Sequence, residues 1–82
     1  MRYMVTFRPR PDCAAQLREA VPAEQAHSKA MQDAGVVLHL FVSSPGHAWF
    51  VVEAADRDEA ERLVRKFPMH RYVEAVVDPL IG

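Results

Sequence analysis

The sequence has few of the features that secreted, membrane-spanning or nucleic-acid-binding proteins need. Its one cysteine, Cys13, has no partner within the chain, so nothing indicates a disulfide scaffold or secretion. No apolar run approaches the roughly 20 residues of a membrane span, and the N-terminal residues lack a signal-peptide pattern. Ten Lys and Arg against eleven Asp and Glu give a net charge of −1, whereas a small nucleic-acid-binding domain is usually basic. We therefore expect a soluble cytoplasmic protein with no nucleic-acid or membrane partner.

The sequence also contains no linker, internal repeat or low-complexity segment, which predicts a single domain over residues 1–82. Half of the residues are hydrophobic and 26% are charged, the balance of an ordinary globular protein. A chain this short buries only roughly 60–65% of the surface that its unfolded form exposes. Its own core is therefore small, and association into a homo-oligomer is the natural remedy.

The first half of the chain has the pattern of a strand followed by a long helix. Apolar and polar residues alternate over Arg2–Arg8, which is the period of a half-buried strand, and two prolines end it. Asp12 is the expected N-cap of a helix whose apolar stripe continues to Gly35, a residue suited to a C-terminal cap. Pro22 inside this helix predicts a kink or a split, because proline lacks the N–H donor and clashes with the preceding turn.

The second half of the chain predicts a hairpin, a helix and a last strand. The three strands expected here cover Val36–Ser43, His47–Ala54 and His70–Val77. Ser44-Pro45-Gly46 has turn chemistry, and Asp56 with Glu59 resembles a capping box that opens a helix ending before Pro68. The order βαββαβ predicts a ferredoxin-like α+β fold, in which a four-stranded antiparallel sheet carries two helices on one face.

The two faces of this predicted sheet differ in composition. One set of alternating strand residues is almost purely apolar and is assigned to the face that the helices cover: Tyr3, Val5, Phe7, Val36, Leu38, Leu40, Val42, Ala48, Phe50, Val52, Ala54, Val73, Ala75 and Val77. The other set mixes polar residues with Phe41, Trp49, Tyr72 and Val76, which is too much apolar area to leave in water. Enriched aromatic residues with few charges are typical of an interface core. We expect this mixed face to meet a second copy of the chain, forming a homodimer.

Glu24 interrupts the apolar stripe of the long helix, between Val21 and Ser28. A carboxylate at this position faces the sheet, and desolvation would raise its pKa toward the range that suits a proton-transferring base. Two structural explanations compete with this one: the kink at Pro22 turns Glu24 to solvent, or an arginine pairs with it. His27, one turn later, forms either an acid–base pair with Glu24 or a surface hydrogen bond.

Three histidines, His39, His47 and His70, share the mixed face with Glu53 and Glu74. Imidazole and carboxylate groups suit zinc or iron. The strands, however, do not give these residues the short spacing of a metal-ligand motif. The interpretation that we favour makes the histidines interface or strand-end residues, so no metal is expected.

Several short segments resemble the muconolactone delta-isomerase family. They are Ala23-Glu24-Gln25-Ala26-His27, Gly35, Leu38-His39-Leu40, Gly46-His47 and Phe67-Pro68-Met69-His70-Arg71-Tyr72. The resemblance implies ferredoxin-like subunits whose sheets pair as a dimeric α+β barrel, and proton transfer on an unsaturated lactone without metal or cofactor. It places the family's expected base on Glu24 and two of its histidines on His39 and His47. Leu38 and Val42 stand where the family has arginines, which removes partners for a substrate carboxylate.

Residues and resemblance together predict a cofactor-independent isomerase or cyclase that moves a proton on a small unsaturated lactone or carbonyl substrate, such as a biosynthetic intermediate. Glu24 is the predicted base and His39 the second predicted catalytic residue, and Tyr72, His39 or His47 is expected to donate a hydrogen bond to the developing oxyanion. The residues predicted to bind substrate are His27, His47, Trp49 and Tyr72. Because Glu24 approaches the covered face and the histidines lie on the other, one site includes both only at the sheet edge or across a subunit boundary. The alternatives are a cofactor-free oxygenase of the dimeric α+β barrel type and a non-catalytic small-molecule-binding subunit.

Overall fold

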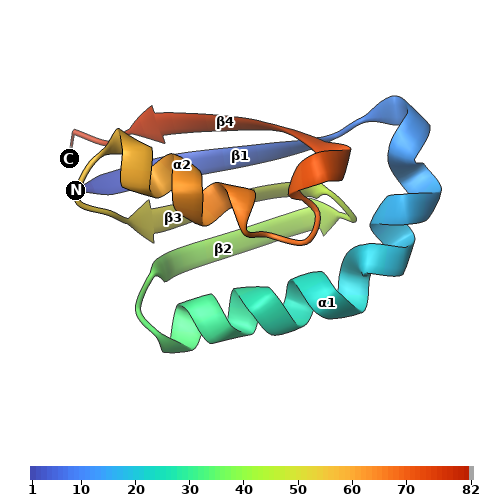
Figure 1. The fold of residues 1–82 in the computed structure, drawn as a ribbon, viewed down its shortest axis with the longest axis horizontal. Coiled ribbons are helices and arrows are strands. Elements are labelled where there is room, and N and C mark those ends of the chain that lie inside the picture. The colour runs from blue at the N-terminus through green and yellow to red at the C-terminus, as the bar shows by residue number, and fades with distance from the viewer. Residues whose placement is uncertain (82) are drawn as a thin grey trace.

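The computed structural model describes residues 1–81 and shows a sheet covered on one side by two helices (Figure 1). Four antiparallel strands lie in the order β2-β3-β1-β4. The elements are β1 (Arg2–Pro9), η1 (Pro11–Cys13), α1 (Ala14–Asp33), β2 (Val37–Ser44), β3 (His47–Glu53), α2 (Arg57–Arg65), η2 (His70–Tyr72) and β4 (Val73–Pro79), where η1 and η2 are 3-10 turns. The predicted βαββαβ order and ferredoxin-like α+β fold are confirmed.

The long helix α1 begins later than predicted and bends where proline interrupts it. The prediction of Asp12 as N-cap is wrong, because Pro11 starts a separate 3-10 turn that contains Asp12. The N-cap is Cys13, which makes no side-chain capping hydrogen bond. The helix continues through Pro22, and Figure 1 shows its axis changing direction within its light-blue to cyan part, where Pro22 lies. The proline therefore kinks α1 without splitting it.

Both helices have the predicted caps at one end. Gly35 adopts φ 76° after α1, and its N–H donates to the Gln32 carbonyl at 3.0 Å, while the next amide reaches the Met31 carbonyl at 2.9 Å. These two bonds are those of a Schellman cap. At the start of α2, the Asp56 carboxylate accepts a hydrogen bond from the Glu59 N–H at 2.9 Å.

The start of β2 departs from the predicted alternation. Val37, not Val36, is the fully buried residue there, with 4% of its surface exposed. The register with β3 shifts between Val37 and His39, which makes Leu38 the extra residue of a β-bulge. From His39 to Val42 the predicted alternation holds, because the bulge has reset the pairing, and a second register shift follows between Val42 and Ser44.

The last strand begins at Val73 rather than at His70. The N–H groups of His70 and Tyr72 donate to the carbonyls of Phe67 and Met69, both at 2.9 Å, so the backbone is still turning over this stretch. These local bonds satisfy the backbone before the ladder with β1 starts. The prediction that His70 and Tyr72 lie on the mixed sheet face is therefore wrong.

The core lies between the sheet and the helices, and three phenylalanines from different elements meet within it. The ring centroid of Phe7 is 5.0 Å from that of Phe50 and 5.8 Å from that of Phe67, and both pairs of rings meet edge to face. The rings of Phe50 and Phe67 are 4.9 Å apart. This cluster joins β1 and β3 to the segment that follows α2.

The two helices contribute unequally to this core. The 9-residue α2 buries Ala60 and Val64, whereas the 20-residue α1 buries only Leu17 and Ser28. Ser28 is also polar, so the apolar contribution of α1 is small for its length. Helix α1 thus leaves room between itself and the sheet.

The face of the sheet away from the helices remains uncovered in the single chain. Phe41 is 64% exposed and Val76 is 48% exposed there. Trp49 is half-buried, and Val51 is buried beneath its neighbours. The predicted apolar character of this face is present, although Tyr72 is not part of it.

Candidate functional site

A cavity of about 450 Å³ lies between α1 and the covered face of the sheet. One side is formed by α1, another by the β2–β3 hairpin, and the segment after α2 completes it. The lining residues are Phe7, Val21, Glu24, Gln25, Ser28, Gln32, Leu40, Val42, Ser44, Pro45, Gly46, Ala48, Phe50, Phe67 and Met69. The cavity thus occupies the room that the sparse packing of α1 leaves.

Glu24 is the one ionisable side chain among these lining residues. Its Oε1 accepts a hydrogen bond from the Met69 N–H at 3.0 Å. Burial raises the pKa of the Glu24 carboxyl, and the hydrogen bond opposes part of this rise. The ion pairs within residues 1–81 join Met1 to Glu53, Lys29 to Asp33 and Arg57 to Glu61. The kink has therefore not turned Glu24 to solvent, and no arginine pairs with it in the described part of the chain.

The Met69 amide reaches Glu24 because of the turn after α2. Met69 is the N-cap residue just before η2, and its N–H has no partner inside the turn itself. The residue is 4% exposed, so this donor would be buried without an acceptor if Glu24 were absent. The contact spans 45 positions of the sequence and ties the middle of α1 to the segment before β4. Sequence analysis missed this backbone donor, because only the tertiary fold brings it to α1.

His27 lies one turn after Glu24 but does not line the cavity. Its ring packs edge to face against Phe67, with centroids 4.6 Å apart. Burial and the nearby charge of Lys66 lower the pKa of the His27 imidazole. Its Nε2 is buried and has no hydrogen-bond partner in residues 1–81, Glu24 included. The structure therefore forms neither the acid–base pair nor the surface hydrogen bond that the sequence suggested.

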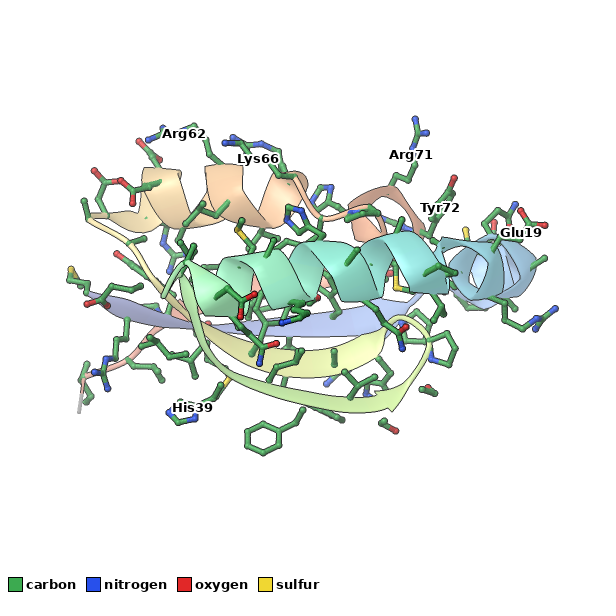
Figure 2. The ribbon with its side chains drawn as sticks, turned by 90° about the horizontal axis from the view of Figure 1, so that it is seen from below. Glu19, His39, Arg62, Lys66, Arg71 and Tyr72 are labelled. Atoms are coloured by element: carbon green, nitrogen blue, oxygen red, sulfur yellow. The ribbon has the colours of Figure 1, made fainter. Side chains whose placement is uncertain are left out.

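His39, His47 and Trp49 lie on the uncovered face, across the sheet from Glu24. His39 is opposite Val51 in the ladder, and the rings of His47 and Trp49 are 4.6 Å apart. Figure 2 shows His39 pointing away from both helices. One chain therefore does not bring the predicted catalytic residues Glu24 and His39 together, and its cavity excludes His47 and Trp49.

Tyr72 belongs to neither of these two places. It lies in η2, with the Arg71 guanidinium 5.9 Å from its ring centroid. Figure 2 shows Tyr72 and Arg71 on the helix side of the sheet, pointing outward. Tyr72 does not line the cavity either, so the predicted substrate-binding set is dispersed over the chain.

The three histidines considered as metal ligands are also separated. His39 lies in β2, His47 begins β3, and His70 lies in η2. Within residues 1–81, no three His, Cys, Asp or Glu side chains gather as metal ligands would. In the same residues, neither helix is long and apolar enough to cross a membrane.

The polar side chains that share the α1 side of the cavity with Glu24 were missed by sequence analysis. Gln25, Ser28 and Gln32 all line the cavity, and Ser28 is 8% exposed. A signal existed, because Glu24, Ser28 and Gln32 are spaced by four residues and so share one helix face. The spacing shows a common face, but not that the face borders a cavity.

A family comparison covers the whole sequence. The family model described as muconolactone delta-isomerase matches residues 1–82. Among curated proteins, no significant match to this sequence is found. The resemblance seen in the sequence segments is therefore confirmed at the level of the family.

Two solved structures are similar to this chain. One is a 5-chloro-2-hydroxyhydroquinone dehydrochlorinase from Burkholderia phenoliruptrix AC1100 in complex with 2,5-dihydroxybenzoquinone; it is 13% identical, with a TM-score of 0.80, over 100% of this chain and 95% of that one. The other is a muconolactone isomerase that is 17% identical, with a TM-score of 0.77, over 100% of this chain and 90% of that one. At such low identity the likeness establishes the fold.

Proposed function

This chain belongs to the muconolactone delta-isomerase family, and from that membership we propose that it is a cofactor-independent isomerase or cyclase acting on a small unsaturated lactone or carbonyl compound. The observation that carries the proposal is Glu24, the one ionisable group lining an otherwise uncharged cavity and held there by the Met69 N–H at 3.0 Å. The similar structures are named for isomerase and dehydrochlorinase chemistry, and one holds a small oxygenated ring compound. Both facts support a small-molecule enzyme.

The proposed reaction needs one base and no redox partner. The Glu24 carboxylate takes a proton from a carbon next to the substrate carbonyl, and the C–H electron pair moves into the carbonyl to form an enolate. The protonated Glu24 returns the proton to another carbon of the conjugated system, which moves the double bond. In a cyclase, the enolate carbon instead attacks a second carbonyl of the same molecule, and the new alkoxide takes the proton.

The surroundings of Glu24 suit both halves of this transfer. The Met69 N–H occupies Oε1 and orients the carboxyl, while Oε2 makes no hydrogen bond within residues 1–81 and is left for substrate. Burial raises the pKa of Glu24, which brings its protonated form closer to neutral pH and so helps the return of the proton. The apolar residues around it, such as Phe50 and Leu40, keep water away from an enolate.

We assign the uncovered sheet face to a homodimer interface. The exposed Phe41 and Val76, with Trp49 between them on the same face, form an apolar surface that a second copy would bury. His39 and His47 are interface residues in this arrangement. A catalytic role for His39 then requires the cavity of a neighbouring copy.

The test of the proposed function is the conversion of a panel of unsaturated lactones and cyclic enones in D₂O, in which mass spectrometry and NMR follow both the rearranged product and any deuterium that it carries. We expect Glu24→Gln to slow the formation of product by roughly 10²–10⁴, the contribution of a positioned base. Its melting temperature should stay level or rise, because a neutral amide is less costly to desolvate than a carboxylate. Glu19→Gln is the matched control, since Glu19 is an exposed carboxylate on the same helix (Figure 2) and should keep the wild-type rate.

Other outcomes would point elsewhere. Equal rates of product formation in wild type and Glu24→Gln would remove Glu24 from the mechanism. Oxygen uptake with a phenol or quinol would favour the cofactor-free oxygenase. Saturable ligand binding with neither rearranged product nor deuterium incorporation would favour a non-catalytic binding subunit.

A further inference from the structure

The chemistry of the cavity lining restricts what the cavity can hold, beyond the presence of a base. Among the described lining residues there is no lysine, arginine or histidine, and the only charge is that of Glu24. A ligand carboxylate inside would therefore face one negative charge and no positive one. Without an opposite charge, the desolvation of such an anion is not compensated. The lining selects for an uncharged ligand.

The polar and apolar groups of the lining are on separate elements. Polar side chains come mainly from α1, through Glu24, Ser28 and Gln32. The sheet contributes mostly apolar groups, including Phe50 and Leu40. A flat molecule can lay one ring face on the apolar strands and turn one edge toward α1. Oxygen atoms of such a ligand would gain hydrogen bonds only along that edge.

The three polar residues of α1 form a regular row. Four residues of α-helix rise about 6 Å, so Glu24 and Ser28 are separated by about 6 Å along the axis and Glu24 and Gln32 by about 12 Å. This row matches a molecule of two or three fused rings with oxygen atoms along one side. Ser28 is the middle member and lies one helical turn from the proposed base.

Ser28 has the burial and the free hydroxyl that a ligand contact requires. It is 8% exposed, and its Oγ enters none of the side-chain hydrogen bonds found within residues 1–81. A hydroxyl both donates and accepts, so it can bond a carbonyl or a hydroxyl of the ligand. Its distance along the helix from Glu24 sets which carbon of the ligand lies at the carboxylate.

We propose that this cavity takes an uncharged, flat, fused-ring carbonyl compound with its oxygen-bearing edge against α1, and that Ser28 is the specificity-determining residue that holds that edge. The proposal rests on the proposed function for the chemistry at Glu24, but the binding preference is measured separately from it. A compound of this class loses its affinity when it carries a carboxylate. It also loses affinity when the Ser28 hydroxyl is removed.

The experiment uses coumarin, an uncharged two-ring lactone, and coumarin-3-carboxylate, its charged counterpart, titrated by NMR into the isotope-labelled full chain. We expect coumarin binding to be saturable and to shift the amide signals of residues 24–32. Coumarin-3-carboxylate should bind more weakly than coumarin, by roughly tenfold or more. Glu24→Gln should bring the two affinities closer, because it removes the opposing charge. Ser28→Ala should weaken coumarin roughly three- to tenfold, the loss of one hydrogen bond.

Ser43→Ala is the matched control for Ser28→Ala, because Ser43 is exposed and outside the cavity lining. It should leave coumarin affinity unchanged. Tighter binding of the carboxylate, or no saturable coumarin binding, would overturn the ligand class. An equal affinity in Ser28→Ala and wild type would overturn the role of Ser28. Each of these results is independent of deuterium incorporation, so a failure of Glu24 as base is recognised separately.

Discussion

The two faces of the four-stranded sheet differ in what covers them and in the residues that they present. The covered face carries a cavity lined by α1, the β2–β3 hairpin and the segment after α2, and this lining includes the half-buried carboxylate of Glu24. The uncovered face carries Phe41, 64% exposed, and Val76, 48% exposed, beside a half-buried Trp49. This difference underlies our two proposals, a small-molecule site on the covered face and a homodimer interface on the uncovered one.

The contrast follows from how the helices pack. Helix α2 covers its part of the sheet with buried Ala60 and Val64, as a structural helix does. Helix α1 is bent at Pro22 and packs less closely on the sheet, so Glu24 and Ser28 line a cavity beneath it, while Gln25 and Gln32 also reach solvent.

The largest expected effect concerns the uncovered face. Trp49→Glu should dissociate the proposed dimer, because an unpaired charge buried in an interface costs roughly 3–5 kcal/mol. Size-exclusion chromatography with light scattering at micromolar concentration measures the result. Gln16→Glu adds the same charge on the exposed side of α1 and should leave the dimer intact. A wild-type protein that elutes as a stable 9.3 kDa monomer would contradict the assignment of this face.

A smaller effect, on stability, is expected for a substitution at Gly46 in the β2–β3 hairpin. Gly46 has φ 82°, and a Cβ there would lie 2.8 Å from two methyl carbons of the buried Leu17. Gly46→Ala should therefore lower the free energy of unfolding by roughly 2–3 kcal/mol, because alanine is strained in the left-handed conformation and its Cβ overpacks against Leu17. Gly35→Ala is the matched control, because Gly35 has φ 76° with no atom within 4 Å of its Cβ.

Thermal unfolding of the two glycine variants separates the two causes. Gly35→Ala should lower the free energy of unfolding only by the roughly 1–2 kcal/mol of backbone strain. The extra loss in Gly46→Ala corresponds to a melting temperature lower by roughly 4–8 °C per kcal/mol in a domain of this size. Equal losses would mean that the Leu17 side chain moves aside without cost.

The smallest effect is a pH dependence of stability from two half-buried titratable groups of α1, Glu24 and His27. The pKa of Glu24 is raised by folding, so its contribution to stability is complete below its ordinary pKa of about 4.3 and is lost as pH rises through the raised value. The pKa of His27 is lowered, so its contribution is complete above about pH 6.5 and is lost as pH falls. Relative to wild type, Glu24→Gln should gain stability with rising pH and His27→Leu with falling pH.

Melting temperatures between about pH 4 and about pH 8 measure these two trends, since the ordinary pKa values of Glu and His fall within that range. The two variants should deviate from wild type at opposite ends of the range. Parallel profiles for all three proteins would show that neither group is desolvated in solution as it is in the structure.

Local patterns were sufficient where each element marks its own ends. The cap at Gly35, the capping box of Asp56 and the turn at Gly46 were all predicted, because they depend on residues close in sequence. The prediction failed at Asp12 and at His70, where a short 3-10 turn precedes the regular element. Such turns use the same residue types as the elements they adjoin, so composition does not separate them.

The inward direction of Glu24 follows from helical periodicity alone, since Glu24 lies between Val21 and Ser28 on one stripe. Periodicity cannot indicate how far a helix stands from its sheet, and that distance creates the cavity. Nor does it indicate that the Met69 amide, 45 positions away, meets the Glu24 carboxylate. Local hydrogen bonds and side-chain alternation act between neighbours in the chain, and sequence shows these directly. The cavity, its missing positive charge and the desolvation of Glu24 depend on contacts between distant segments, which exist only once the chain has folded.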